Sequence, residues 1–480
     1  MVEIVRSIGT TDSEMYLARL ADQTFLNLWS YPNVYMKPGK ELCDLLVVCG
    51  DHVIIFSDKT ISWQKDIDLG LAWCRWYRRA VKKSSDQLLR AEQWVKNYPD
   101  RIFLDRGCKK PLPIKLPSPE KRKIHLIAVA LGAHEACTEF FDGDSGSFMV
   151  VPLLKDGVHY DQASKLFAPF TIGDVNSAGT FIHVLNDITL DIIMRELDTV
   201  IDFTDYLEQK VIFIRSGYLV SAAGEEELLA YYLTHMESGS SKHSFTTPHN
   251  QPWKGNQRIG IDKGLFAGML KNPQYIRKKT ADQDSYIWDE LIKAFTSTML
   301  AGTSIMPDNG QFILAEHEIG VRCMALEPRL MRRMLASGIL GLLEKSHLQD
   351  RAFRTMLPNP TIDKAGIAYV IMTLAYPKKE VVDSYEQYRK VRSNMLMTYC
   401  LSVLKKYPYV KRVVGFATEP PSTEYSSDSS EDLVTALQPE QWTEDVEASL
   451  TASLKDFDMM KEGHIKHFHS HDSEYPDSTD

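Results

Sequence analysis

The sequence predicts a multi-domain protein of the α/β class. Its 480 residues exceed the usual size of a single domain, about 100–150 residues. A composition with 44% hydrophobic and 25% charged residues resembles that of average globular proteins and excludes a disordered or collagen-like chain. Apolar runs of strand length alternate with stretches in which apolar residues recur every three or four positions, as in amphipathic helices. These observations together indicate mixed sheets and helices.

The expected organisation follows from composition and from the spacing of apolar residues. In chain order we expect a first α/β domain at 1–110, a Pro- and Lys-rich linker at 111–123, a middle α/β domain at 124–240, a C-terminal helical plus β-α-β domain at 256–418, and an acidic, largely disordered tail at 419–480. The linker contains four prolines, which favour an extended chain over regular structure. The tail is rich in Ser, Asp and Glu, a composition typical of disorder.

Within the later segments, individual elements are predicted from apolar periodicity. We expect strands at 124–131, 148–154, 180–185, 211–214, 367–374 and 410–417, and helices at 189–207, 380–405 and 443–460. The strand at 367–374, the helix that follows and the strand at 410–417 form a β-α-β pattern. Such a pattern predicts two parallel strands joined by a helical crossover.

Cysteine usage and apolar runs bear on the expected location of the protein. The seven cysteines are few for this length and form no Cys-x-x-Cys pair, which favours a reducing compartment and predicts no zinc ribbon. The first residues lack the apolar stretch of a signal peptide. The longest smooth apolar run, Leu126–Leu131, is far shorter than the roughly 20 residues that a membrane helix requires. We therefore expect a cytoplasmic protein with no membrane partner.

The net charge of −9 conceals two regions of opposite sign. Residues 1–123 carry 21 Lys and Arg against 15 Asp and Glu, a net charge of +6. Residues 419–480 carry 3 against 16, a net charge of −13. The total charge taken alone argues mildly against a nucleic-acid partner, but the basic N-terminal segment is compatible with one.

The clearest chemical pattern lies in two apolar runs that are joined by a Gly50-Asp51 turn. The first run opens with Asp44 and the second closes with Lys59, and together they predict a β-hairpin. An aspartate and a lysine on adjacent buried strands are costly unless they pair or serve chemistry. Metal-dependent phosphodiester hydrolysis uses such a pair, because carboxylates hold Mg²⁺ and a nearby lysine stabilises the transition state. A purely structural ion pair is the alternative.

The order helix, strand with Asp44, hairpin, strand ending at Lys59 and basic helix resembles the restriction-endonuclease-like PD-(D/E)xK nuclease superfamily. The resemblance covers about the first 100 of the 480 residues. It implies an N-terminal α-β-β-β-α-β core, catalytic roles for Asp44 and Lys59, and Mg²⁺ or Mn²⁺ as cofactor. It also implies contributions from a glutamate of the first helix, here Glu14, and from a glutamine of the helix after the hairpin, here Gln87.

The sequence departs from the superfamily pattern two positions before Lys59, where Ser57 stands in place of an acid. The neighbouring Asp58 is acidic, but strand alternation turns it to the opposite face unless a bulge intervenes. We retain both Ser57 and Asp58 as candidate catalytic residues.

The second metal ligand must then come from Glu14, Glu41 or Asp58. We take Asp44, Glu14 and Asp58 as the candidate metal ligands. The segment from Thr11 to Glu14 is also a capping-box sequence, which by itself explains the glutamate.

The predicted helix after the hairpin carries a stripe of positive charge. Its members recur at helical spacing and, with Gln87, are the candidate nucleic-acid-binding residues: Arg75, Arg78, Arg79, Lys82 and Lys83. A positive stripe beside a carboxylate–lysine site suits a phosphate backbone. The alternative is an ordinary solvated helix face.

These patterns predict a metal-dependent nuclease that hydrolyses phosphodiester bonds, with DNA favoured over RNA. By analogy with nucleases of this kind, we expect a role in bacterial restriction or anti-phage defence. Many such nucleases pair to cut both strands, so a homodimer is one expected form of the protein. The alternative is a catalytically inactive protein of nuclease fold that binds nucleic acid or another protein.

Overall fold

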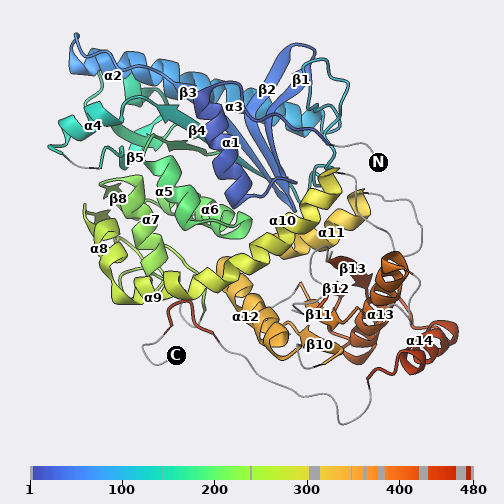
Figure 1. Ribbon diagram of the computed structural model, residues 1–480. Coiled ribbons are helices and arrows are strands. Elements are labelled where there is room, and N and C mark those ends of the chain that lie inside the picture. The colour runs from blue at the N-terminus through green and yellow to red at the C-terminus, as the bar shows by residue number, and fades with distance from the viewer. Residues whose placement is uncertain are drawn as a thin grey trace. The chain divides into compact units, whose positions relative to one another are not determined.

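The computed structural model describes residues 4–143, 145–237, 240–301, 314–346, 349–359, 365–376, 384–420, 431–460 and 472–476. The chain divides into two compact units (Figure 1). The larger unit comprises residues 5–280 and the segment from 473 onward, and the smaller unit comprises residues 1–4 and 281–472.

A five-stranded mixed sheet forms the core of the larger unit. Its strands, in spatial order, are β1 (Ser30–Lys37), β2 (Lys40–Cys49), β3 (His52–Thr60), β4 (Lys123–Leu131) and β7 (Ile182–Leu185). The first three are antiparallel neighbours, joined by turns at Gly39 and Gly50, whose φ angles are positive. Glycine adopts such angles without strain. In contrast, β4 is parallel to β3, and β7 is parallel to β4.

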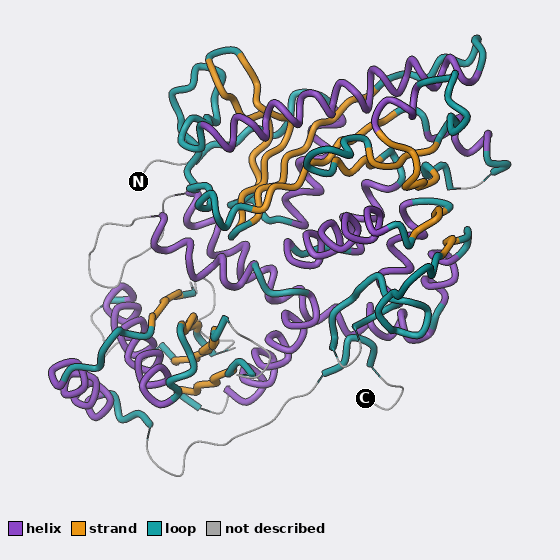
Figure 2. The backbone as a smooth tube through the Cα atoms, turned by 180° about the vertical axis from the view of Figure 1, so that it is seen from behind, coloured by secondary structure: helices purple, strands orange, loops and turns teal. Residues whose placement is uncertain are grey.

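Helices cover both faces of this sheet (Figure 2). On one face, α1 (Asp12–Thr24) packs against β1, β2 and β3. On the other, α3 (Lys83–Asn97) packs against β3 and β4. The helix α2 (Leu69–Tyr77) leads into α3 through a π-helical turn, η1 (Arg78–Lys82). The crossover that a parallel β3–β4 pair requires is thus a long helical segment.

The mixed α/β class is confirmed. The chain runs through α1, β1, β2, β3, α2–α3 and β4, but β4 lies at 123–131, beyond the segment 1–110 in which a complete core was expected. The strands β4 and β7 come from the segment expected to form a middle domain, yet they hydrogen-bond into the same sheet as the N-terminal hairpin. Residues of both segments therefore share one core.

The rest of the larger unit forms a second, four-stranded sheet and several helices. The strands, in spatial order, are β6 (Thr171–Asp174), β5 (Met149–Lys155), β8 (Leu219–Ala222) and β9 (Ile259–Ile261). The helices are α4 (His134–Phe140), η2 (Asp156–Tyr160), α5 (Thr189–Glu196), α6 (Val200–Ser216), α7 (Glu225–Thr234), α8 (Leu265–Lys271) and α9 (Pro273–Ala281), which ends at the boundary of the unit.

Two sequence expectations in this region need correction. The segment 211–214 is not a strand but the last part of α6, which begins at a Thr199 cap and ends at Gly217 in the left-handed conformation. The expected helix at 189–207 is two helices, α5 and α6, with the break between them at residues 197–199. The Thr199 side chain accepts the N–H of Asp202 and so starts a new helix.

The smaller unit contains a four-stranded sheet covered by helices. Its strands, in spatial order, are β10 (Arg351–Met356), β11 (Ile367–Leu374), β12 (Arg412–Thr418) and β13 (Asp432–Leu437). Its helices are η3 (Asp282–Ser285), α10 (Tyr286–Ala301), α11 (Leu314–Ala325), α12 (Arg329–Ser346), α13 (Tyr385–Lys406) and α14 (Glu444–Asp456). The strands β11 and β12 are parallel and joined through α13, as the β-α-β pattern predicted.

The expectation of a largely disordered tail after residue 418 is wrong for 432–456. The strand β13 pairs with β12, and α14 packs against α13. The acidic Asp432 is buried because Arg389 and Arg392 both donate to its carboxylate. Charge composition alone could not reveal these partners. Among the described residues, no helix combines the length and apolar character needed to cross a bilayer.

Candidate active site

The β2–β3 hairpin places the carboxylate of Asp44 beside the ammonium group of Lys59. Asp44 is only 4% exposed, and its Oδ2 lies 3.5 Å from Lys59 Nζ. The same oxygen accepts a 2.6 Å hydrogen bond from the backbone N–H of Asp58. Lys59 Nζ also donates to the Asp58 carbonyl at 3.0 Å. Burial raises the pKa of Asp44, and Lys59 and the Asp58 N–H oppose that rise.

Asn33 of β1 links two further carboxylates to this region. Its Nδ2 donates to Glu14 Oε2 at 3.0 Å and to Glu41 Oε1 at 2.9 Å. Asn33 has φ of 49°, in the left-handed region that asparagine enters more readily than most residues. The β1–β2 register also shifts between Val34 and Tyr35. No sequence signal pointed to Asn33, because neither the left-handed angle nor the register shift follows from the strand pattern.

Glu14 completes the predicted capping box and also lies within hydrogen-bonding distance of Asn33. It completes the capping box at the start of α1, where Thr11 Oγ1 accepts the Glu14 N–H and Glu14 Oε2 accepts the Thr10 and Thr11 N–H groups. The same Oε2 faces Asn33. Burial acts to raise the pKa of Glu14, but hydrogen bonds led by Thr10 and Asn33 outweigh burial and lower it. Capping and proximity to the acidic cluster are therefore compatible.

Asp58 lies on the opposite face of β3 from Ser57, toward Ser13 of α1. It is 6% exposed, and neither carboxyl oxygen has a hydrogen-bond partner of good geometry among the described residues. Burial raises its pKa to about 6, Asp44 and Glu14 add to that rise, and the Ser13 hydroxyl opposes it. A buried acid with so little hydrogen bonding is expensive, so its retention is compatible with a role for its oxygens.

The acidic cluster, defined as Glu14, Glu41, Asp44 and Asp58, is electrostatically coupled. Burial raises the pKa of Glu41, and Asp44 and Glu14 raise it further. The carboxylates do not form a closed metal cage, however. Among the described residues, the sole group of three or more His, Cys, Asp or Glu ligand atoms within 4.8 Å of one another is His52, His125 and Glu208. A cation at the acidic cluster would have to draw the carboxylates closer together.

Ser57 and Gln87 meet on the α3 side of the sheet. Ser57 is fully buried, and its hydroxyl donates to Ser84 Oγ and to Gln87 Oε1, both at 3.3 Å. The residue that replaces the expected acid is thus a bridge between β3 and α3. The strand alternation expected for Ser57 and Asp58 is what the structure has, without a bulge at this position.

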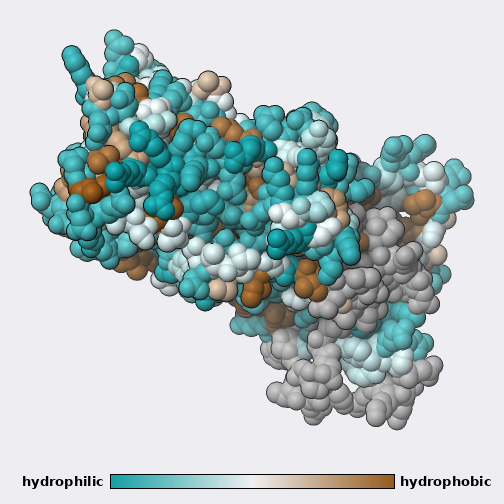
Figure 3. All heavy atoms as spheres, turned by 90° about the horizontal axis from the view of Figure 1, so that it is seen from above, coloured by the Kyte–Doolittle hydropathy of each residue, from teal (hydrophilic) through white to brown (hydrophobic). Residues whose placement is uncertain are grey.

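The basic stripe lies on the solvent side of the helical segment that covers β3 and β4. Its five members are all exposed: Arg75, Arg78, Arg79, Lys82 and Lys83. The π-helical turn at 78–82 interrupts the spacing from which the stripe was predicted. Some members have local partners, since Arg78 stacks on Tyr160 at 5.0 Å and Lys82 pairs with Asp86. Seen from above, the side on which α2 and α3 lie in Figure 1, the surface is mostly hydrophilic (Figure 3).

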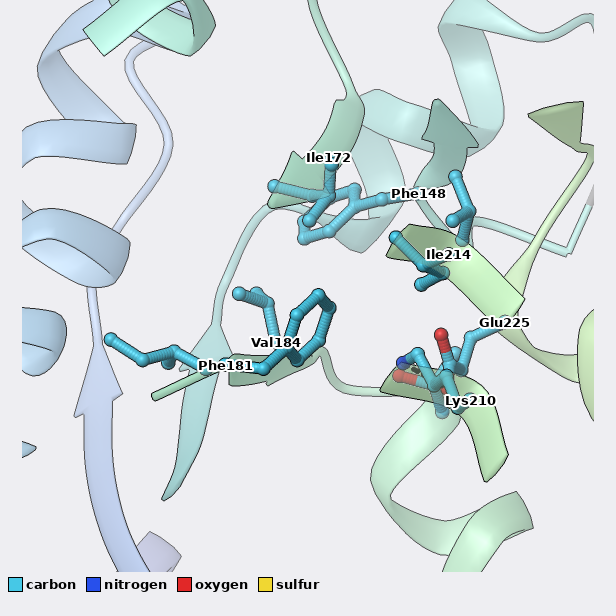
Figure 4. Close-up of a pocket in the computed structure, with 11 residues that line it drawn as sticks. Phe148, Ile172, Phe181, Val184, Lys210, Ile214 and Glu225 are labelled. Atoms are coloured by element: carbon cyan, nitrogen blue, oxygen red, sulfur yellow. Dashed lines mark hydrogen bonds and ion pairs between the residues drawn. The ribbon is translucent and has the colours of Figure 1, made fainter. Parts of the chain in front are cut away.

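A small cavity lies apart from these residues, between β5, β6, β7 and α6 (Figure 4). Apolar side chains such as Phe148, Phe181 and Val184 line it, and Lys210 and Glu225 form a buried ion pair at one side. Tyr206 also donates to Glu225, at 2.7 Å. The cavity has room for about one water molecule, some 20 Å³, which is too little for a substrate.

Comparisons of the chain with family models, curated proteins and solved structures gave no match. The geometry of the site is therefore the basis on which a function can be assigned.

Proposed function

We propose that the chain is a metal-dependent nuclease that hydrolyses phosphodiester bonds, with DNA as the favoured substrate and Asp44 and Lys59 at the centre of its active site. The observation that carries this proposal is the pairing of a 4%-exposed aspartate on β2 with a lysine at the end of the adjacent β3. The order α1, three antiparallel strands, α2–α3 and a parallel β4 is the order that the PD-(D/E)xK resemblance implies, and it supports the same interpretation.

The donor set around Asp44 suits a hard cation. Mg²⁺ and Mn²⁺ prefer oxygen ligands, and three further carboxylates, of Glu14, Glu41 and Asp58, influence one another's ionisation here. The two oxygens of buried Asp58, which have no hydrogen-bond partner of good geometry among the described residues, are the observation that best fits a bound cation. Asp44 would be the central ligand, with Asp58 and Glu14 beside it. A bound Mg²⁺ or Mn²⁺ supplies an activated water and neutralises charge on the phosphate.

The remaining steps fall to residues of the chain. The Lys59 ammonium, held by Asp44 Oδ2 and the Asp58 carbonyl, points a positive charge at the place where negative charge develops on the phosphate. The Asn33 amide holds Glu14 and Glu41 near each other by donating to both, and these hydrogen bonds offset part of the repulsion between the two carboxylates. The exposed basic stripe offers contacts to the phosphate backbone outside the site.

A catalytically inactive binding protein is the second candidate, and one observation favours it. Ser57 occupies the position at which the superfamily pattern expects an acid, and its hydroxyl is engaged with Ser84 and Gln87. In that case the basic stripe would hold nucleic acid, or another surface a protein, without cleavage.

The two candidates separate in one assay. The full chain is incubated with duplex DNA, single-stranded DNA and RNA in Mg²⁺, Mn²⁺ or EDTA, alongside Asp44→Asn and the control Asp51→Asn in the exposed turn of the same hairpin. The nuclease proposal expects cleavage that EDTA and Asp44→Asn abolish and Asp51→Asn preserves. Salt-sensitive binding of DNA without cleavage by the wild-type chain would instead support the binding protein.

A further inference from the structure

A second cluster of ligating side chains lies at the far end of the strands that carry the candidate active site. His52 is the first residue of β3, and His125 lies near the start of β4, where it is in register with Ile54. Because β3 and β4 are parallel, their first residues meet at the same sheet edge. Glu208 reaches this edge from α6. His52 and Lys59 are seven positions apart along β3, or about 23 Å in an extended strand.

Three atoms of this cluster surround a point at metal-binding distance. His52 Nδ1 lies 3.1 Å from His125 Nε2, and each of these nitrogens lies 3.9 Å from Glu208 Oε1. In a triangle with these sides, the point equidistant from the three atoms is about 2.1 Å from each, which matches zinc–nitrogen and zinc–oxygen distances of about 2.0–2.2 Å. The three ligand atoms are therefore spaced as the ligands of one ion would be.

Both imidazoles of the cluster are buried, since His52 is 7% exposed and His125 is 6% exposed. In the structure the two facing nitrogens are at hydrogen-bond distance, which requires that one of them carries a proton. When an ion binds to both nitrogens, that proton moves to the other nitrogen of the same ring.

The ammonium group of Lys123 forms an ion pair with Glu208 of the cluster. Its Nζ donates to Glu208 Oε2 at 3.1 Å and lies 3.0 Å from Oε1. The Lys123 side chain is 50% exposed and can swing into solvent, whereas Oε1, the oxygen nearest both imidazoles, is buried and, among the described residues, has Lys123 as an ion-pair partner but accepts no hydrogen bond of good geometry. Lys123 therefore competes with a metal ion for the same carboxylate.

We propose that His52, His125 and Glu208 form a binding site for Zn²⁺ that fastens the first residues of β3 and β4 to α6. Two imidazole nitrogens and one carboxylate oxygen favour Zn²⁺ over Mg²⁺, which takes oxygen ligands. The zinc site is independent of the proposed nuclease function, because it uses none of the acidic cluster. Three protein ligands leave a further position of the ion for water.

The test measures Zn²⁺ binding to the metal-free full chain by calorimetry. Four histidines of the C-terminal segment lie outside the described residues and would also bind zinc, so every protein carries them as glutamine: His464, His467, His469 and His471. We expect one high-affinity Zn²⁺ in this background. His52→Gln and Glu208→Gln should each weaken it roughly 100-fold, and His249→Gln, which changes an exposed histidine, should not.

Two additional readouts separate a metal site from a merely structural cluster. Lys123→Met should strengthen Zn²⁺ binding roughly 10-fold, because it removes the competing cation. Co²⁺ in place of Zn²⁺ should give visible d–d bands without a thiolate charge-transfer band, since no cysteine is a ligand. Circular dichroism confirms that each variant is folded. Zn²⁺ binding that is equal in the background protein and a His52→Gln, Glu208→Gln double variant, or that weakens in Lys123→Met, would overturn the proposal.

Discussion

The Asp44 carboxylate of β2 accepts a hydrogen bond from the backbone N–H of Asp58 on β3, with 2.6 Å between Oδ2 and the nitrogen. We predict that Asp44→Ala lowers the free energy of unfolding by about 1–3 kcal/mol, because it leaves a buried N–H without an acceptor. Asp44→Asn keeps an acceptor and should lower it by less than half that amount, although both variants should lose cleavage. Urea denaturation measures the difference. Equal destabilisation by both variants would show that this hydrogen bond does not hold the hairpin.

Asp58 should make stability depend on pH between about 4 and 6. Its pKa rises from 3.8 to about 6 in the folded chain, so the folded state binds a proton in this window that the unfolded state has released. The resulting stabilisation is complete below pH 4 and disappears as the pH rises through 6. Its size is on the order of 3 kcal/mol, at about 1.4 kcal/mol per tenfold change in proton affinity.

Because other buried acids titrate in the same window, the measurement compares wild type with Asp58→Asn. The difference in unfolding free energy between them, followed by denaturant titration from pH 4 to pH 7, should shift in favour of Asp58→Asn as the pH rises. If it does not change with pH, Asp58 ionises normally. Should Asp58 bind the metal, Mg²⁺-dependent cleavage should also increase as the pH passes 6.

Ser57 and Asp58 can be distinguished by which of them cleavage requires. Ser57→Ala removes two 3.3 Å hydrogen bonds to α3 and should cost about 1 kcal/mol of stability while the cleavage rate changes less than about 2-fold. Asp58→Ala should abolish cleavage if its oxygens bind the metal. A cleavage assay with both purified variants reports the outcome. If Ser57→Ala loses cleavage and Asp58→Ala does not, Ser57 rather than Asp58 takes the role of the acid in the superfamily pattern.

The basic stripe should determine how DNA binding depends on salt. Neutralising Arg75, Arg79 and Lys83 to Gln should weaken DNA binding and reduce the slope of log affinity against log salt by about 2–3, since each phosphate that is no longer neutralised lowers the slope by about 0.9. Fluorescence anisotropy across a salt series measures this slope. Arg106, Lys109 and Lys110, also exposed, form a control set of equal charge. If both sets reduce the salt slope equally, DNA binding depends on the overall charge of the protein and not on the basic stripe.

The local pattern of the hairpin was sufficient to predict the pairing of Asp44 with Lys59. Two apolar runs around Gly50-Asp51 specify antiparallel strands. Antiparallel pairing brings together the two strand ends that lie farthest from the turn, where Asp44 and Lys59 stand. Asn33 was not predictable in the same way, because its role depends on a left-handed backbone angle and a register shift in β1. The contact between Glu14 and Asn33 likewise depends on where α1 lies against the sheet.

The His52, His125 and Glu208 cluster escaped sequence reasoning because its members lie far apart along the chain. Nothing in their spacing resembles a metal motif, and they meet only because β4 pairs in parallel with β3. The apolar pattern assigned β4 to a separate domain, so the long-range pairing was out of reach. For the same reason Asp432 was expected in a disordered tail, although two arginines of α13 bury it.

The proposed role of Lys59 is tested by single-turnover cleavage of duplex DNA by Lys59→Met, with Lys40→Met in the same hairpin as control. We predict that wild type and Lys40→Met cleave in Mg²⁺ or Mn²⁺, and that Lys59→Met is slower by at least about 100-fold with unchanged DNA affinity and unfolding. Cleavage by Lys59→Met at the wild-type rate would refute the role of Lys59, and no metal-dependent cleavage by the wild-type chain would refute the nuclease proposal.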